Sequence, residues 1–386
     1  MDLDYPPAAQ AFRAEVRAWL EANLPRDLCG WTLRDPLTPE LLERLRGWQR
    51  TLADAGFGAV AWPVDHGGRG AGAVEQLVMA EELARLDAPA AVNPIGLTNV
   101  APSIMAFGTS EQRSRHLPAI LRGDEIWCQG FSEPDAGSDL ASLRTLAEHD
   151  GSDTLVVSGT KIWSTLAGHA ERCELLVRTD PSSRHHEGLS VLLVDMASTG
   201  IEVRPLPTMT GGNEFAEVSF DAVRVPIGDR LGPAGSGWRV AMTTLGFERA
   251  GVANLFLRTD ARLRRVHDAV VRRPGGASAT MIDRLCRCHV DTALLRLLAL
   301  RAITAAARGR APGPEASLAK LLWVRAEHAI AEAAGAVLGP DAVVGGSPWA
   351  ADICASPGIA IAGGTTEIQK TILAERVLGL PRDPQP

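Results

Sequence analysis

Apolar side chains recur every three or four residues over the first third of the chain. Residues 41–56, LLERLRGWQRTLADAG, and residues 74–87, VEQLVMAEELARLD, show this spacing most clearly. Apolar positions at such intervals fall on one face of an α-helix, which can then pack against a core. The pattern therefore predicts a helical region from Pro7 to Arg122.

The pattern changes near Gly123 to short β-branched runs separated by Gly, Asp, Ser and Pro. Runs of this kind, bounded by turn-forming residues, are typical of strands. Beyond residue 233 helical spacing returns and continues almost to the C-terminus. The predicted strands are 153–165, 174–180, 188–196, 201–207 and 216–226, and the predicted late helices are 238–273, 281–308, 315–338 and 366–378.

The order of helices, strands and helices predicts an α+β fold of three domains. Strands gathered in one segment argue against a parallel sheet, in which strands and helices alternate. We expect an N-terminal helical domain at residues 1–122, a middle β domain at 123–233 and a C-terminal helical domain at 234–386.

Composition and charge exclude several classes of partner. The 386 residues are 46% hydrophobic with a net charge of -7, and acids and bases are interspersed, so no basic stripe suits nucleic acid. The six cysteines lack the spacing of a disulfide framework or a metal site. The chain opens with acids in place of a secretory signal, and it has no apolar run of about 18 residues. We expect a cytoplasmic protein with no metal and no membrane partner.

The glycine-rich loops differ in what they predict. DHGGRGAG, residues 65–72, follows a helical stretch and not a strand, so it is a turn and not a dinucleotide-binding motif. GFSEPDAGSDLASLRT, residues 130–145, has hydroxyls and carboxylates alternating with Gly and Pro. Its backbone N–H groups could bind a polar heterocycle or a phosphate, although a plain surface turn has the same composition.

Residues 159–168, GTKIWSTLAG, predict a strand that carries an indole and a hydroxyl two residues apart. Side chains at Trp163 and Thr165 would therefore point to one face. The indole offers a wall for stacking and the hydroxyl a hydrogen bond. A tryptophan in a strand is also commonly a core residue.

The C-terminal segment, residues 361–382, predicts a capped helix. Thr366 and Gln369 have the spacing of a capping box, and Gly379 would end the helix. Gly363 and Gly364 would let another group approach the backbone, while the unpaired N–H groups of the helix start suit a diphosphate. A terminal helix with a flexible entry is the alternative.

Glu248 lies on a predicted helix whose same-face neighbours are largely apolar. Those neighbours are Thr244, Leu245, Gly251 and Val252. Desolvation there would raise the pKa of the carboxyl group and make it a better base. The alternative is an ion pair with Arg249 or another arginine on a purely structural helix.

In their order and spacing, these stretches resemble the acyl-CoA dehydrogenase family of flavoproteins over essentially the whole chain. FSEPDAGSDL (131–140) is similar to the family's T-E-P-x-A-G-S-D signature, and KIWST (161–165) to its K-x-W-I-T. GGTTEIQKTILAERVLGLPR (363–382) is similar to its C-terminal E-G-T-x-x-I-Q helix. The resemblance implies a middle antiparallel β barrel, a C-terminal four-helix bundle, and FAD held between them in a homodimer or homotetramer.

The resemblance also implies roles for single residues. Phe131 and Ser132 would lie against the flavin ring, Trp163 would pack on it, and Thr165 would hydrogen-bond near its N5 atom. Ser138 would contact the acyl-CoA. Two further positions match those that contact the FAD diphosphate and ribose, and these are Thr365 and Glu367.

The chain departs from the family at the position of the catalytic base. Many members have Glu there, preceded by Tyr, where this chain has Gly363 and Ala362. Other members carry the base in an L-x-x-E-R segment, which LGFER matches with Glu248 and Arg249. We expect Glu248 to be the base, Arg249 to contact the substrate, and the Gly363 N–H group to polarise the thioester carbonyl.

The resemblance predicts FAD-dependent α,β-dehydrogenation of an acyl-CoA thioester, with electrons passing to an electron-transfer flavoprotein. The missing Tyr and Glu side chains favour a bulky or branched acyl chain. An oxygen-using oxidase or hydroxylase on the same fold is one alternative. A subunit of a heteromeric dehydrogenase is another, because some bacterial relatives pair an active with an inactive chain. The family's R-x-x-F-G segment has no Phe-Gly pair here at VVRRPGGASATMIDRL, where Arg272 or Arg273 could serve, so the resemblance leaves the assembly open between a dimer and a dimer of dimers.

Overall fold

The computed structural model describes most of the chain. The described residues are 5–183, 185–250, 255–272, 276–310, 313, 315–344 and 347–382. Within these ranges, the side chains at 248–250, 315 and 348 lie outside the description.

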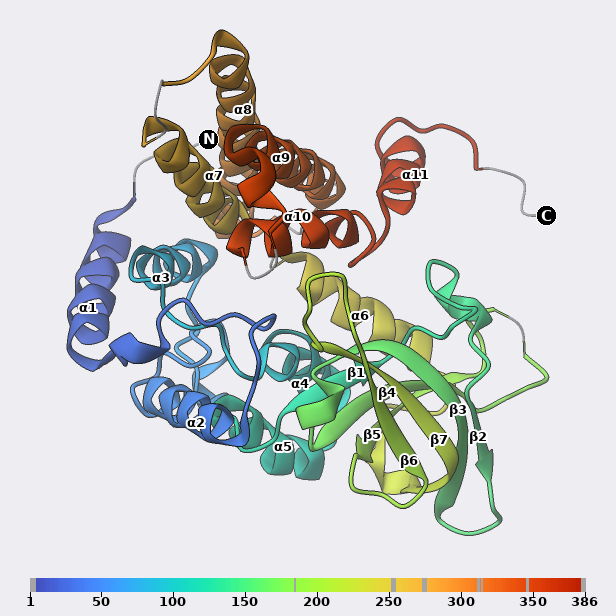
Figure 1. The fold of residues 1–386 in the computed structure, drawn as a ribbon. Coiled ribbons are helices and arrows are strands. Elements are labelled where there is room, and N and C mark those ends of the chain that lie inside the picture. Colours follow the sequence, from blue (N-terminus) through green and yellow to red (C-terminus); the bar gives the residue numbers. More distant parts are fainter. Residues whose placement is uncertain are drawn as a thin grey trace.

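The N-terminal region is helical, as the spacing predicts (Figure 1). The first and third helices pack on each other, as do the second and fifth. A π-helical turn, η3 (Gly96–Val100), runs directly into the fourth helix. The helices are α1 (Pro7–Asn23), α2 (Pro39–Asp54), α3 (Ala73–Arg85), α4 (Ala101–Phe107) and α5 (Ser110–Arg122).

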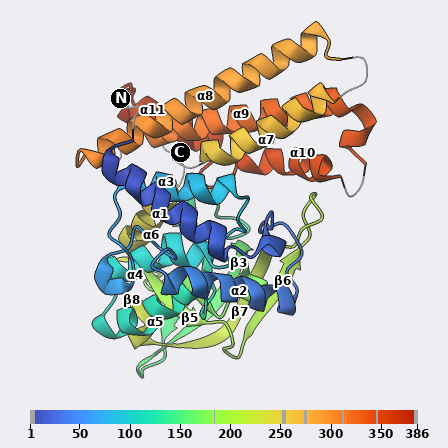
Figure 2. The ribbon, with the colours of Figure 1, turned by 90° about the vertical axis from the view of Figure 1, so that its left-hand side faces the viewer.

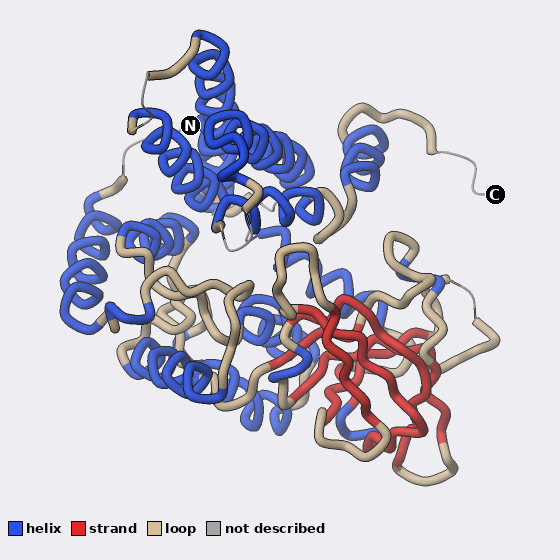
Figure 3. The backbone as a smooth tube through the Cα atoms, viewed as in Figure 1, coloured by secondary structure: helices blue, strands red, loops and turns tan. Residues whose placement is uncertain are grey.

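All described strands belong to one sheet in the middle of the chain (Figure 3). It has eight strands, in the order β6-β7-β3-β2-β4-β5-β8, with β1 paired to β4 off this path. Their bounds are β1 (Trp127–Gly130), β2 (Leu146–His149), β3 (Thr154–Thr165), β4 (Arg172–Arg178), β5 (Leu189–Asp195), β6 (Ile201–Leu206), β7 (Phe215–Pro226) and β8 (Arg230–Leu231).

The expectation of an antiparallel barrel needs correction. The pairings of β4 with β1 and with β2 are parallel, so the sheet is mixed. This arises because β1 and β2 both reach β4 by crossing over and not by a tight hairpin. Among the described strands no pairing joins β6 to β8, so the sheet is open in these pairings and the barrel stays a prediction.

The C-terminal region returns to helices. Helix α9 packs against α7, α8, α10 and α11, and Figure 2 shows α7, α8 and α9 side by side. No helix among the described residues is long and apolar enough to cross a membrane. The helices are α6 (Gly237–Ala250), α7 (Leu255–Val271), α8 (Ala279–Ala307), α9 (Glu315–Leu338), α10 (Pro348–Ile359) and α11 (Thr366–Arg376).

Helix α6 differs from the other late helices in its neighbours. It packs on β4 and β5 and on the η3–α4 segment, away from α9. An apolar cluster fills this junction and includes Ile104 of α4, Trp127 of β1, Leu176 of β4 and Val240 of α6. The sheet, the N-terminal helices and α6 therefore share one core, which fixes α6 against the strands.

Candidate active site

The loop that follows β1 is held tightly against the sheet. Phe131 is 8% exposed and packs in the junction core. Gly130 precedes it, and a Cβ atom there would lie 2.6 Å from Leu175 Cδ1. A larger residue at this position would have to displace the buried Leu175 side chain.

A buried ion pair anchors the same loop to β3. Lys161 Nζ donates to Glu133 Oε1 at 2.9 Å and to the Phe131 carbonyl at 3.0 Å. Glu133 also accepts from the Thr145 hydroxyl at 2.6 Å and from the Arg144 N–H at 2.7 Å. The Thr145 N–H is the fourth donor, at 2.8 Å, and together these bonds fix the loop on the strand.

The charges of this pair follow from burial and partners. Burial alone would raise the pKa of Glu133, but the Lys161 ammonium and the hydrogen bonds outweigh it and lower the pKa. Burial lowers the pKa of Lys161 to about 8, against the opposing attraction of Glu133. Both groups are therefore charged at neutral pH.

Trp163 is an exposed aromatic wall and not a core residue. Its side chain is 58% exposed, and its ring meets Phe215 edge-on at 5.8 Å between centroids. A register irregularity between Lys161 and Ser164 gives Trp163 a φ of 61°. Lys161 and Ser164 are buried, whereas Trp163 is exposed and Thr165 is half-buried.

The structure brings the flavin-facing candidates together. The Ile162 N–H donates to the Ser132 carbonyl at 2.9 Å, so the Phe131–Ser132 loop adjoins the strand that carries Trp163 and Thr165. An exposed indole two residues from a half-buried threonine on the same strand suits a flat heterocycle with polar edges. These residues fit the isoalloxazine ring that the resemblance implies.

The start of α11 is capped one residue earlier than predicted. Thr365 is the N-cap, and its hydroxyl accepts from the Ile368 N–H at 3.3 Å. The predicted capping box of Thr366 and Gln369 is therefore wrong. Gly363 and Gly364 have φ values of 67° and 92°, and their turn directs Gln369 Nε2 to the Gly363 carbonyl at 3.2 Å.

The tail candidates form a separate group in the described chain. Gly363 and Glu367 are exposed, and α11 packs against α9. Lys320 of α9 donates to the carbonyls of Ile359 and Ala362, at 2.8 Å each, and so fixes the segment before Gly363. Among the described residues, no hydrogen bond or ion pair joins this group to the Trp163 end of the sheet.

Ser138 is exposed on the loop after Glu133. The neighbouring Asp139 lines a cavity of about 500 Å³, together with Ser142 and the basic side chains Arg144 and Arg178. The Arg178 guanidinium donates hydrogen bonds to backbone carbonyls, including that of Ala141 at 2.8 Å. Arg178 is therefore held in place at this cavity, beside the loop expected to contact the acyl-CoA.

The predicted base lies outside the described side chains. The backbone of Glu248 and Arg249 continues α6, but their side chains lie outside the description. Thr244, one helical turn earlier, is fully buried. The assignments of Glu248 and Arg249 therefore stay predictions.

Sequence reasoning missed one buried carboxyl group near α6. Glu174 of β4 is 0% exposed and accepts from Gln129 Nε2 at 2.9 Å and from the Thr244 hydroxyl at 3.0 Å. Burial raises its pKa to about 7, because these two hydrogen bonds only partly offset the loss of water. The signal was a lone acid in the otherwise apolar strand core CELLV (173–177).

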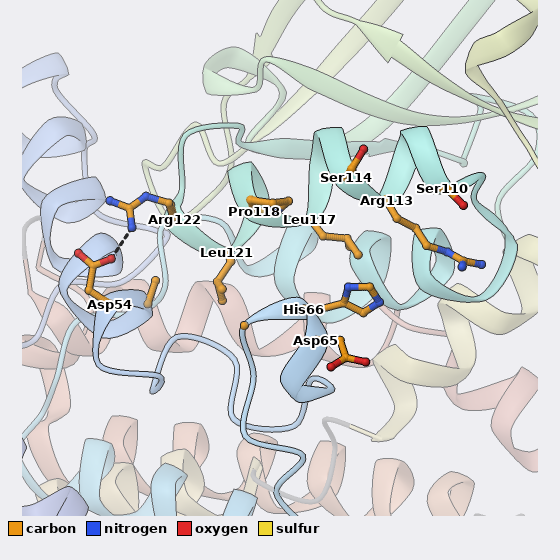
Figure 4. A pocket seen from close by; sticks show the side chains of 12 residues that line it. Asp54, Asp65, His66, Ser110, Arg113, Ser114, Leu117, Pro118, Leu121 and Arg122 are labelled. Carbon is orange, nitrogen blue, oxygen red and sulfur yellow. Dashed lines mark hydrogen bonds and ion pairs between the residues drawn. The ribbon is translucent and has the colours of Figure 1, made fainter.

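The larger of two described cavities lies elsewhere. It encloses about 570 Å³ between α5 and the 65–67 turn, and an ion pair of Arg122 with Asp54 borders it (Figure 4). None of the predicted site residues lines it. Among the described residues, no group of three or more His, Cys, Asp or Glu side chains is arranged to hold a metal ion.

Family models match the chain in three consecutive parts. The acyl-CoA dehydrogenase N-terminal, middle and C-terminal domains match residues 6–124, 128–223 and 235–378. Proteins named acyl-CoA dehydrogenase IpdE1 from Mycolicibacterium smegmatis and from Mycobacterium tuberculosis are each 40% identical to it. Both comparisons cover 97% of this chain and 98% of the relative.

Solved structures agree with these matches. One titled Tcur3481-Tcur3483 steroid ACAD has a TM-score of 0.85 and 29% identity over 99% of this chain and 100% of that one. The ChsE4-ChsE5 complex from Mycobacterium tuberculosis has a TM-score of 0.83 and 32% identity, with the same coverage. The chain therefore belongs to the acyl-CoA dehydrogenase family of FAD-dependent oxidoreductases.

Proposed function

We propose that this chain, in the cytoplasm, dehydrogenates a bulky acyl-CoA thioester between its α and β carbons, with Glu248 as the base. The observation that carries the proposal is the tail turn. Gly363, at the position of the usual acid, has no side chain, while LGFER supplies an acid on α6. Family membership provides the reaction class, and this departure provides the choice of base.

Each residue has a defined task in this reaction. Glu248 removes the α-proton, a step for which a positioned base contributes about 10²–10⁴ in rate. The Gly363 N–H group donates to the thioester carbonyl and so makes the α-proton more acidic. Trp163 and Thr165 would hold FAD with Phe131 and Ser132, and bound FAD supplies the two-electron acceptor.

The remaining candidates bind the ends of the two ligands. Thr365 and Glu367 would contact the diphosphate and ribose of FAD at the start of α11, where the positive end of the helix dipole favours an anion. Ser138 would contact the acyl-CoA beside the basic cavity, and Arg249 would contact the substrate near the base. Electrons would then pass to an electron-transfer flavoprotein.

A bulky acyl chain follows from the small residues at 362 and 363. Ala and Gly replace the Tyr and Glu of many members, and the lost side-chain volume borders the expected acyl site. One structural relative, at 29% identity, is titled a steroid ACAD, which supports a polycyclic substrate. Activity that favours butyryl-CoA over branched or sterol-derived thioesters would contradict this part of the proposal.

A second candidate is that the chain acts as one subunit of a heteromeric dehydrogenase. The Phe-Gly pair through which many members reach the neighbouring subunit's FAD is missing, and Arg273 lies outside the described residues. Two structural relatives have titles that name pairs of proteins. Co-purification with an unlike chain of similar size would support this assembly over a homodimer or homotetramer.

Anaerobic titration with a panel of acyl thioesters tests the reaction directly. Productive thioesters should bleach the flavin, and Glu248→Gln should slow bleaching by about 10²–10⁴ while FAD stays bound. Glu148→Gln, an exposed glutamate of β2, is the matched control. Undiminished bleaching in Glu248→Gln would remove Glu248 from its role, and rapid oxygen consumption would favour an oxidase.

A further inference from the structure

Glu174 lies at the centre of a buried hydrogen-bond network that the proposed reaction does not use. Thr244 Oγ1 lies 3.0 Å from Glu174 Oε1 and 2.6 Å from Ser103 Oγ of α4. On the other side, Gln129 Nε2 donates to Glu174 Oε2 at 2.9 Å and Asn99 Nδ2 donates to Gln129 Oε1 at 3.1 Å. One carboxyl group therefore connects β4 with β1, α6 and the η3–α4 segment.

The network can satisfy Glu174 in either protonation state. If the carboxyl group is ionised, the Thr244 hydroxyl donates to it. If it is protonated, it donates to Thr244 Oγ1, and the Thr244 hydroxyl then turns to the Val240 carbonyl, 3.2 Å away. Protonation thus reverses the direction of the hydrogen bond between Glu174 and Thr244, and it directs the Thr244 hydroxyl hydrogen to the backbone of its own helix.

Among the described side chains around Glu174, none pairs with it as an opposing charge, and on α6 Glu248 and Arg249 lie outside the described side chains. It faces Gln129 of β1, Leu193 of β5 and Thr244 of α6, and neither η3 nor α4 has a charged residue. On the other elements, Arg239 of α6 lies over the Phe107 ring, and Asp195 at the end of β5 pairs with Arg172. Cys173 and Cys128 interact with each other near Lys161, which pairs with Glu133.

An ionised Glu174 would therefore be a buried charge with two neutral donors. Burial raises its pKa to about 7, so protonation is retained up to neutral pH. Above about pH 7, the free-energy cost of the buried charge can be reduced by entry of water or by movement of the elements that surround Glu174. Helix α6 is the element expected to move, because its contact with β4 includes the hydrogen bond between Thr244 and Glu174.

We propose that Glu174 is a positioning residue for the dehydrogenation, which in its protonated form fixes, through Thr244, the turn of α6 that precedes Glu248. Thr244 lies four residues before Glu248 and hence on the same face of the helix. This inference rests on the proposed function, since Glu248 is the base there. Ionisation of Glu174 would loosen the turn and misplace the base.

The pH profile of flavin reduction tests the positioning role. In the FAD-loaded wild type, the rate of anaerobic bleaching by a productive thioester should fall above about pH 7 by at least tenfold, since misplacement by about 1 Å can cost about 100-fold. Glu174→Gln cannot titrate and should lose this alkaline fall. The same alkaline fall in Glu174→Gln would overturn the proposal.

Two adjacent threonines give a matched comparison on α6. Thr244→Val removes the hydroxyl from the network and should lower kcat by about tenfold with little change in KM, because it misplaces the base without altering the binding surfaces. Thr243→Val removes only a hydroxyl bonded to the Arg239 carbonyl at 2.9 Å and should leave both constants unchanged. Equal effects of the two substitutions would contradict the role of Thr244.

Hydrogen exchange separates this proposal from the proposed function. In the FAD-loaded protein without thioester, amides of α6 should lose protection above about pH 7 in the wild type, after correction for intrinsic exchange, and keep it in Glu174→Gln. If no thioester bleaches the flavin, the proposed function fails while this measurement still reports on the network. Protection of α6 that does not change with pH in the wild type would overturn the proposal.

Discussion

Replacing Glu174 with glutamine should change how the stability of the protein depends on pH. Burial raises the pKa of this glutamate in the folded chain from the ordinary 4.5 to about 7. Between these values the folded protein keeps a proton that the unfolded chain has lost, so its free energy of unfolding falls as the pH rises. The stabilisation is complete below the unfolded pKa and is lost as the pH passes the folded one.

The size of the effect follows from the two pKa values. The interval from 4.5 to about 7 corresponds to about 3 kcal/mol, at about 1.4 kcal/mol for each pH unit. Most of this, about 2–3 kcal/mol, is lost between about pH 5 and about pH 8.5. Glutamine cannot titrate, so Glu174→Gln should gain this amount relative to the wild type over that range.

Urea unfolding at one protein and FAD concentration measures the difference. At each pH the free energy of the wild type is subtracted from that of the variant, so the other titrating groups, present in both, cancel. Glu174→Leu is the control: it should show the same dependence on pH but a lower stability throughout, because it leaves Gln129 Nε2 without its acceptor. A difference that stays constant within about 0.5 kcal/mol would show that Glu174 titrates alike in both states and would refute the reasoning.

Three further predictions concern the loop, the indole wall and the tail. Lys161→Met leaves the Glu133 carboxylate buried without its cation and should cost about 3–5 kcal/mol in urea unfolding, and adding Glu133→Gln should recover part of it. An unchanged or larger loss in the double variant would contradict the ion-pair interpretation. Trp163→Ala removes a side chain that is 58% exposed, so stability should change by less than about 1 kcal/mol while FAD, followed by its fluorescence, binds up to about tenfold more weakly. Equal FAD affinity would exclude Trp163 as the stacking wall. Thr365→Val should reduce the stability of α11 by about 0.5–2 kcal/mol, measured by hydrogen exchange, whereas Thr366→Val should leave it nearly unchanged. A larger loss of α11 stability in Thr366→Val than in Thr365→Val would indicate that Thr366 is the N-cap.

The sequence predicts the order of helices and strands because each region has a clear periodicity. The strand at 153–165 and the helix at 315–338 agree with β3 and α9 to within one residue. Helix α10 has no such pattern, since PWAADICASPGI contains Pro357 and is nearly uniformly apolar or small. Strands β1 and β2 are only four residues each, and their parallel pairing with β4 depends on contacts distant in the chain.

Part of the candidate site could be predicted from the sequence, and part could not. The motifs place Ser132 and Trp163 on segments that a hydrogen bond between Ser132 and Ile162 joins in the fold. Helix α11 follows a left-handed turn at Gly363 and Gly364 and has Thr365 as its N-cap. The spacing of Thr366 and Gln369 predicted the cap one residue later, because it does not reveal this turn. Glu174 was read only as part of a strand, because its importance depends on burial and on partners from other elements.

The backbone at Gly363 disfavours any side chain at this position. Its φ of 67° is a conformation that costs any residue with a Cβ atom about 1–2 kcal/mol, and its carbonyl is engaged by Gln369. A glutamate at 363 would therefore add strain to the turn from which α11 starts. Moving an acid into this turn would cost stability that an acid within the regular helix α6 does not cost.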